Sequence, residues 1–263
     1  MNSLTELPAE RQCHKQIFEA IYGTKGCPAC AECLLFRAGY AWCKQCRKKW
    51  SAKAASLLRH SNLSYRRLWV LLWCWQKQKS VGTAAHIAGT SYPTVQRWFL
   101  RFREHLPKST LQLSGIVEVD ESFFGRQKYG SQQIVVGAIE RDTRRVRLAI
   151  VPDRAQDTLE LFLTDTVQRG SHLTTDAHAG YHDLEFYGYT HERCNHSTGH
   201  FGPTNMIENF WGVVKRSLRR LYGKLTLPDL ANILKEWEQR QNSPELFYTV
   251  PNYLRATVVF RVR

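Results

Sequence analysis

Two sets of side chains in this 263-residue sequence could bind metal ions, and they call for different metals. The first set is two C-x2-C pairs formed by Cys27, Cys30, Cys43 and Cys46. Four thiolates on two short turns suit a tetrahedral zinc ion, which replaces the core that about 25 residues are too few to build. We predict one structural Zn²⁺ here, and Cys33 is an extra thiol that could substitute for one of the four ligands. A redox role, for which one C-x2-C pair would suffice, and four metal-free thiols are the alternatives.

The second set is three carboxylates from distant parts of the sequence, namely Asp120, Asp176 and Glu208. Each lies near the end of a predicted strand or helix. Carboxylates that converge in a fold repel one another unless divalent cations lie between them. Two Mg²⁺ or Mn²⁺ ions about 3.5–4 Å apart are what two-metal phosphoryl transfer requires.

Each of these acids also has a structural interpretation. Asp176 could cap the helix that follows it, and Glu208 could complete a capping box with Asn205. Asp120 could be an exposed strand residue paired with a lysine. Glu118 shares a strand face with Asp120, because side chains alternate with a period of two, and it competes for the first metal position.

Two cations follow Glu208 along the same predicted helix. Lys215 lies seven residues on, which is about 700° of rotation, so it shares a face with Glu208, and Arg219 extends that face. This arrangement could be a surface network, or it could hold a metal and a DNA phosphate one or two turns apart.

The elements that must position these residues alternate in an α/β pattern after residue 115. Three strand-like runs of residues, separated by short turns, predict an antiparallel meander. Predicted helices and strands then alternate. The pattern resembles the ribonuclease H fold, a mixed sheet flanked by helices. The predicted strands are 116–124, 133–139, 145–151, 171–175 and 188–194, and the predicted helices are 157–169, 178–185, 204–222 and 227–241.

The net charge of +14 belongs almost wholly to the N-terminal part. Residues 1–110 hold 18 Lys and Arg against 5 Asp and Glu, a net charge of +13. A positive field of this kind is typical of a polyanion-binding region, with a solvated basic surface as the alternative. We expect the cluster beside the second cysteine pair to contact the DNA backbone. That cluster is Lys44, Arg47, Lys48 and Lys49.

A helix-turn-helix is predicted between residues 80 and 104, after a helix at about 64–78. Gly89 marks the turn, and the second helix carries an apolar stripe at a period typical of helices. The stripe is Val95, Trp98, Phe99 and Phe102. Gln96, Arg97 and Arg101 lie on other sides of that helix and are candidates for reading base edges.

Composition excludes several classes. A hydrophobic fraction of 43% rules out global disorder, and the longest apolar run of eight residues is far below the roughly 20 of a spanning helix. The N-terminus carries no secretion signal, so we expect a cytoplasmic protein without a membrane partner.

The sequence divides into four predicted parts. They are 1–55 with the zinc site, 56–110 with the helix-turn-helix, 111–225 with the acids, and 226–263 as a C-terminal helix and tail.

Together these motifs resemble bacterial insertion-sequence transposases of the ISXO-like type, with an N-terminal zinc ribbon, a helix-turn-helix and a DDE catalytic core. The similarity spans about residues 25–240. The motifs that carry it, besides the two cysteine pairs, are Val117–Gly125, Thr175-Asp176 with Gly180-Tyr181, Asn195-His196-Ser197, and Thr204–Trp211 with Lys215-Arg216. One departure is Ala31 after the first cysteine pair, where a glycine is expected.

The resemblance implies that Asp120, Asp176 and Glu208 are the metal-binding triad, with Lys215 as the family's lysine seven residues beyond the acid. It implies hydrolysis at the element ends and transfer of the freed 3′-hydroxyl into target DNA. The partners would be the terminal inverted repeats, target DNA and a second copy of the chain, since two ends must meet. Alternatives are a DNA-binding regulator derived from such an enzyme, and a structure-specific nuclease of the same fold. The role of His196 and His200 stays open.

Overall fold

The computed structural model describes residues 7–125, 132–176, 179–194, 205–222 and 229–258. The chain divides into two compact units. The first combines the residues up to Pro107 with those from Pro244 on, and the second runs from Lys108 to Ser243. The second unit is therefore inserted into the first along the chain, and the predicted part 226–263 is divided between them. No helix in these described ranges is long and apolar enough to span a membrane.

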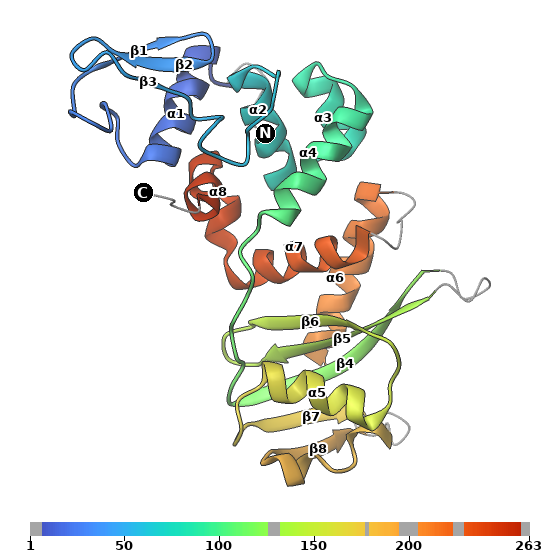
Figure 1. The fold of residues 1–263 in the computed structure, drawn as a ribbon. Coiled ribbons are helices and arrows are strands. Elements are labelled where there is room, and N and C mark those ends of the chain that lie inside the picture. The colour runs from blue at the N-terminus through green and yellow to red at the C-terminus, as the bar shows by residue number, and fades with distance from the viewer. Residues whose placement is uncertain (1–6, 126–131, 177–178, 195–204, 223–228, 259–263) are drawn as a thin grey trace. The chain divides into compact units, whose positions relative to one another are not determined.

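The first unit joins a small sheet to a group of helices (Figure 1). The sheet has the order β1-β2-β3 and is antiparallel. Gly89, at a φ of 59°, ends α3, and Pro93 lies in the first turn of α4. The elements are α1 (Glu10–Tyr22), β1 (Leu34–Arg37), β2 (Tyr40–Cys43), β3 (Lys49–Trp50), α2 (Tyr65–Gln76), α3 (Val81–Ala88), α4 (Tyr92–Glu104), η7 (Pro244–Phe247) and α8 (Val250–Thr257).

The C-terminal helix α8 is part of the core of this first unit. The buried amide of Gln76 donates hydrogen bonds to the carbonyl oxygens of Leu246 and Thr249, at 2.8 Å each. The hydroxyl of Tyr253 donates to the carbonyl oxygen of Phe102 at 2.7 Å. Neither α1 nor α8 was predicted from the sequence, and both complete the core around α2 and α4.

The second unit is built on a five-stranded mixed sheet of order β6-β5-β4-β7-β8. The first three strands in the chain pair antiparallel, and β7 and β8 then run parallel to β4. This is the ribonuclease H-like arrangement that the sequence predicted. The elements are β4 (Ile116–Phe124), β5 (Gln133–Glu140), β6 (Val146–Val151), α5 (Gln156–Thr166), β7 (His172–Asp176), η3 (Ala179–Tyr181), η4 (Leu184–Tyr187), β8 (Thr190–Cys194), α6 (Asn205–Tyr222) and α7 (Leu230–Asn242).

The two faces of this sheet are covered by different helices (Figure 1). Val117 and Val119 of β4 pack in the core that includes α5, whereas Phe124 packs in the core that includes α6 and α7. Gly137 of β5 permits the close approach of α6, because a Cβ atom there would come within 2.5 Å of the Trp211 ring. Odd and even positions of β4 therefore face different helices.

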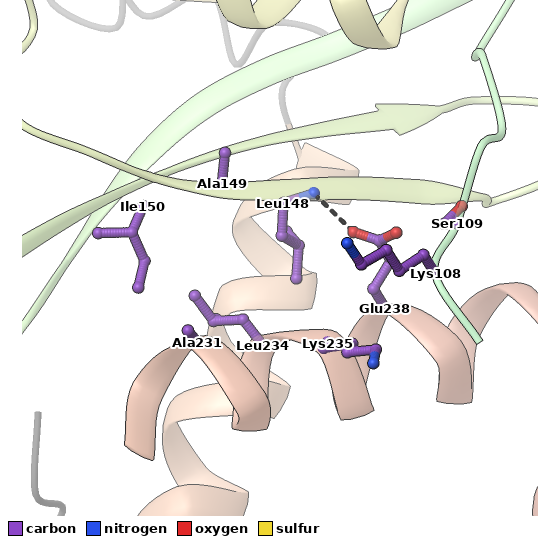
Figure 2. A pocket seen from close by; sticks show the side chains of 9 residues that line it. All are labelled: Lys108, Ser109, Leu148, Ala149, Ile150, Ala231, Leu234, Lys235 and Glu238. Carbon is purple, nitrogen blue, oxygen red and sulfur yellow. Dashed lines mark hydrogen bonds between the residues drawn. The ribbon is translucent and has the colours of Figure 1, made fainter. Parts of the chain in front are cut away.

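The edge strand β6 is covered by side chains of α7. Glu238 accepts a hydrogen bond from the backbone N–H of Leu148 at 3.0 Å, drawn as the dashed line in Figure 2. Asn242 binds both the N–H and the carbonyl of Val146, at 2.8 and 2.7 Å. These contacts satisfy backbone groups that an edge strand otherwise leaves open.

The predicted strands 116–124, 133–139 and 145–151 match β4, β5 and β6 to within one residue at each end. Two predicted helices differ from the structure. The helix predicted over 157–169 ends at Thr166, because Val167 takes an extended backbone. The helix predicted over 178–185 corresponds to the short 3₁₀ turns η3 and η4.

Candidate metal sites and nucleic-acid interface

The four predicted zinc ligands form one cluster. The Sγ atoms of Cys27, Cys30, Cys43 and Cys46 all lie within 4.8 Å of one another. The Cys27–Cys46 and Cys30–Cys43 sulfur pairs are 3.5 Å apart. A tetrahedral zinc site with Zn–S bonds of about 2.3 Å places its sulfurs about 3.8 Å apart, so this donor set fits zinc. Cys33 is exposed and lies outside the set.

Each cysteine pair is followed by a residue with a left-handed backbone. Ala31 follows Cys30 with a φ of 61°, and Arg47 follows Cys46 with a φ of 56°. This is why a glycine is expected after the first pair, since an L side chain at positive φ costs free energy. The first turn is closed by the N–H of Cys27, which donates to the carbonyl of Glu32 at 2.8 Å. The turn therefore keeps its shape with alanine in the glycine position.

Hydrogen bonds in the cluster shift the pKa values of its thiols in opposite directions. Burial raises the pKa of Cys27, but hydrogen bonds from the backbone at Ala29 and Cys30 and from the thiols of Cys46 and Cys30 lower it to about 6. A backbone hydrogen bond at Glu32 lowers the pKa of Cys30, but burial and the hydrogen bonds with the neighbouring thiols raise it to about 12. Thiolates rather than thiols bind zinc, so zinc binding would release protons from this cluster.

An acidic cluster lies in the second unit between the middle of β4 and the end of β7. Carboxylate oxygens of Asp120, Glu121 and Asp176 lie within 4.8 Å of one another. The strand register explains the first and third, because β4 and β7 are parallel with Glu118 opposite Thr174. Two residues further on, Asp120 and Asp176 reach corresponding positions. These hard oxygen donors suit a divalent cation such as Mg²⁺.

Helix α6 brings a fourth carboxylate, that of Glu208, and the cation Lys215 to the Asp120 side of this cluster. Burial raises the pKa of Asp120 to about 6, with further contributions from the negative charges of Glu121, Asp176 and Glu208. Burial lowers the pKa of Lys215, while the nearby Asp120 carboxylate opposes that shift. Among the described residues, the exposed Glu208 is not within the 4.8 Å set, so it lies at the margin of the cluster.

Sequence reasoning did not predict the part played by Glu121. Its buried side chain accepts hydrogen bonds from the hydroxyl of Tyr181 and from Arg154, the latter at 2.9 Å. Arg154 also lies 3.8 Å from Asp176. Alternation along β4 points Glu121 away from Asp120, yet carboxylate oxygens of both lie within 4.8 Å of Asp176, the residue that ends β7. The signal in the sequence was its position beside Asp120.

Glu118, the rival for the first metal position, is occupied by other contacts. Its Oε2 atom accepts hydrogen bonds from the backbone N–H groups of Met206 and Ile207, at 2.8 and 3.2 Å. Its Oε1 atom accepts from Arg141 at 3.2 Å, and the side chain is 3% exposed. Glu118 therefore binds the positive N-terminal end of α6 and fixes it against the strand that carries Asp120.

The basic residues predicted to contact DNA are mostly exposed in the first unit. The predicted apolar stripe of α4 is buried, which leaves Gln96 and Arg97 exposed on the outer side of the helix. Arg101 lies over the Trp98 ring at 5.3 Å. Beside the thiol cluster, the exposed residues are Lys44, Arg47, Lys48 and Lys49. Arg219 is exposed on α6 of the second unit.

The motif Asn195-His196-Ser197, with His200 and Thr204, lies outside the described residues. The role of these two histidines therefore stays as open as the sequence left it.

Comparison with known proteins gives two matches at the level of sequence. The ISXO2-like transposase domain matches residues 112–242. An "Uncharacterized transposase-like protein" from Haemophilus influenzae is 33% identical over 106 residues, which are 39% of this chain and 85% of that protein. The chain belongs to the ISXO2-like transposase family. Its function is therefore that of a DDE transposase, a DNA-processing enzyme.

Solved structures of retroviral integrases are also similar to this ISXO2-like transposase. The catalytic core of BIV integrase aligns with a TM-score of 0.37 and 15% identity, over 49% of this chain and 84% of that one. The catalytic core of HTLV-2 integrase in complex with magnesium aligns with a TM-score of 0.35 and 16% identity, over 50% and 87%. The simian T-cell lymphotropic virus intasome aligns with a TM-score of 0.37 and 12% identity, over 65% and 67%.

Proposed function

We propose that this transposase cuts DNA at the ends of an insertion sequence and joins the freed 3′-hydroxyl to target DNA. The observation that carries the proposal is the meeting of Asp120 and Asp176 at corresponding positions of two parallel strands. Helix α6 adds Glu208, whose negative charge raises the pKa of Asp120. It also adds Lys215, whose pKa is raised by the Asp120 carboxylate against the lowering effect of burial. An acid cluster with a cation beside it suits the handling of a phosphodiester.

Asp120, Asp176 and Glu208 would hold two Mg²⁺ or Mn²⁺ ions. When bound, such ions supply Lewis-acid activation of a water and stabilise the charge on the leaving oxygen. Lys215, with Arg219 further along the same face of α6, would bind the scissile phosphate and neutralise its growing negative charge. Water adds to phosphorus, the bond to the 3′ oxygen breaks, and a 3′-hydroxyl is released.

The released 3′-hydroxyl would then attack a target phosphodiester in the same site. A new bond to phosphorus forms, the target strand's own 3′ oxygen leaves, and no bond to the protein is made. Glu118 contributes by holding the first turn of α6. It is a positioning residue in this scheme.

The first unit would recognise the element ends in the cytoplasm. We propose that it binds one structural Zn²⁺ through the four cysteines and contacts double-stranded DNA through its basic surface. The contacting residues would be Lys44, Arg47, Lys48, Lys49, Gln96, Arg97 and Arg101. Two ends must be brought together, so we expect a homodimer or a larger assembly of this chain.

Strand transfer tests the proposal directly. Purified protein, Mg²⁺, a labelled duplex carrying the DNA end that flanks the gene, and a plasmid are incubated together. We expect plasmid-joined label, and we expect Glu208→Gln to lose both cleavage and joining while DNA affinity stays near that of the wild type. Cleavage without joining would indicate a nuclease, and binding without either would indicate a regulator. Full activity of Glu208→Gln would refute the assignment of the acids.

A further inference from the structure

A groove of about 640 Å³ lies in the first unit between α4 and the loop 59–63 that precedes α2. One wall is the loop, and the other is a single face of α4 and the residue that ends it. The charged lining residues are Arg59, Arg97, Arg101 and Glu104, and the other polar lining groups are hydroxyls, an amide and imidazoles. None of the loop residues was among the DNA contacts predicted from the sequence.

The loop wall is held in place from within the unit. The ammonium group of Lys53 donates to the carbonyl oxygens of Ser61 and Leu63, and it lies over the Tyr65 ring at 4.9 Å. The hydroxyl of Ser61 accepts a hydrogen bond from the N–H of Leu63 at 3.2 Å. The side chains of Arg59 and Asn62 are exposed on this anchored backbone. The groove is thus preformed on both sides.

The chemistry of the lining favours an anion with repeated charges. Arg59, Arg97 and Arg101 line the groove together with a single carboxylate, that of Glu104. The remaining polar side chains are hydroxyl, amide and imidazole groups, all able to donate hydrogen bonds to phosphate oxygens. Phosphate and sugar contacts use these side-chain types and carry no sequence information.

Helix α4 presents its candidate residues on two different sides. Thr94, Arg97 and Arg101 follow one another at intervals of three and four residues, so they share the face that lines the groove. Gln96 is exposed and is not among the lining residues. Gln96 therefore lies on a different side of α4 from the two arginines that line the groove.

We infer that this groove binds one strand of the DNA backbone, and that Arg97 and Arg101, together with Arg59, contact phosphates and do not read bases. This assignment rests on the proposed function, since it needs the first unit to bind duplex DNA. It adds loop 59–63 to the interface and leaves base reading on α4 to residues outside the groove, such as Gln96.

The test compares affinity, salt dependence and sequence preference of the full chain. Binding of a labelled random-sequence 20-bp duplex is measured by fluorescence anisotropy from 50 to 300 mM salt. Each protein is also used to select sequences from a randomised duplex pool. For Arg59→Ala and Arg97→Ala we expect affinity to fall about eightfold at 100 mM salt, and the slope of log K against log salt to shrink by about 0.9, as for one phosphate contact. The selected sequence should stay that of the wild type.

Two further variants sharpen the result. Glu104→Gln removes the acid from the groove and should raise affinity for the same duplex, whereas Arg255→Ala, an exposed cation on α8, should leave affinity unchanged. An Arg97→Ala protein that selects a different sequence at one base position would overturn the inference. If the wild type binds the duplex but Arg59→Ala has the same affinity and the same slope of log K against log salt, the inference is overturned and the proposed DNA-binding role is not. A wild type that binds no duplex would refute both this inference and the proposed DNA-binding role of the unit.

Discussion

The cysteine cluster and the acidic cluster are both sets of metal-ligating side chains, but the chain assembles them in opposite ways. The four cysteines lie between positions 27 and 46, and two short turns bring their sulfurs together. The acids come from β4, β7 and α6, and the parallel pairing of β4 with β7 brings Asp120 and Asp176 side by side. A local cluster needs only turns, whereas a dispersed cluster needs the whole sheet.

This difference sets what each metal does for the molecule. About 25 residues around the cysteines build little core, so zinc would hold that segment together. The acids lie on a sheet with two buried faces, so the fold would hold the metal. Loss of the first metal should therefore cost structure, and loss of the second should cost only chemistry.

The largest effect is expected for Asp176→Asn. The amide keeps the shape of the side chain but removes the charge that would bind a divalent cation beside Asp120. We expect DNA cleavage to fall by at least about 1,000-fold, with thermal stability and duplex affinity close to those of the wild type. A gel-based cleavage assay and a melting curve check this. A loss of folding instead of activity would show that the acidic cluster is structural.

Cys43→Ser should affect structure and binding. Cys43 is fully buried and ends β2, so losing its thiolate removes a ligand and leaves a buried hydroxyl. We expect zinc content to drop and duplex affinity to fall on the order of 100-fold. Metal analysis and anisotropy measure both. The matched control is Cys33→Ser, since Cys33 is exposed and outside the cluster, and an equal loss there would contradict the assignment.

Glu118→Gln should weaken the attachment of α6, which carries Glu208, to β4, which carries Asp120. The amide cannot balance Arg141 or accept as strongly from the N–H groups of Met206 and Ile207. We expect the Mg²⁺ concentration for half-maximal cleavage to rise about tenfold, because α6 no longer holds Glu208 in place. Glu185→Gln, at an exposed position, serves as the control. A lower melting temperature with unchanged Mg²⁺ dependence would leave Glu118 with a purely structural role.

The pH dependence of cation binding should follow Asp120. Burial and the charge of Glu121 raise the pKa of this carboxyl to about 6, so it is protonated in mildly acidic solution and must lose its proton to bind a cation. Apparent Mn²⁺ affinity should rise about fourfold from pH 5.5 to pH 7. Stability without metal should fall over pH 4–6, since the folded state holds the proton more tightly than the unfolded state does. Titration calorimetry and scanning calorimetry of Asp120→Asn should show neither the rise in Mn²⁺ affinity nor the fall in stability that this carboxyl causes.

The smallest effect is expected for Ala31→Gly. Ala31 has a φ of 61° directly after Cys30, a conformation that glycine adopts without strain. The change should stabilise the cysteine-containing turn by about 1 kcal/mol and slow zinc removal by a chelator. Ala29→Gly, in the same turn but without a left-handed backbone, should not slow it. Faster zinc loss from Ala31→Gly would show that the turn needs the methyl group.

The same contrast explains what could be predicted from the sequence. Spacing alone predicted the cysteine cluster, and alternation predicted the three strands of the meander to within one residue. The period of two also placed Glu118 and Asp120 on one face, but it could not show that Glu118 is bound to the start of α6. Contacts of this kind depend on how a helix 88 positions later in the chain packs, which no local pattern encodes.

Glu121 was missed for a related reason. Alternation assigns it to the face opposite Asp120, yet both carboxylates lie close to Asp176, where β7 ends beside the middle of β4. The helices α1 and α8 carry local signals that were not read from the sequence. Gly23 ends α1 with a left-handed backbone, and Thr249 caps α8, which has Pro251 in its first turn. What no local pattern encodes is that the two helices share one core.

The return of the chain end to the first unit has a genetic consequence. A stop codon after position 243 would leave Asp120, Asp176, Glu208 and Lys215 intact, yet it would delete the helix that carries Tyr253 and uncover Trp75 and Phe102. If the first unit binds DNA as proposed, such a shortened copy would keep the acidic cluster and lose duplex affinity.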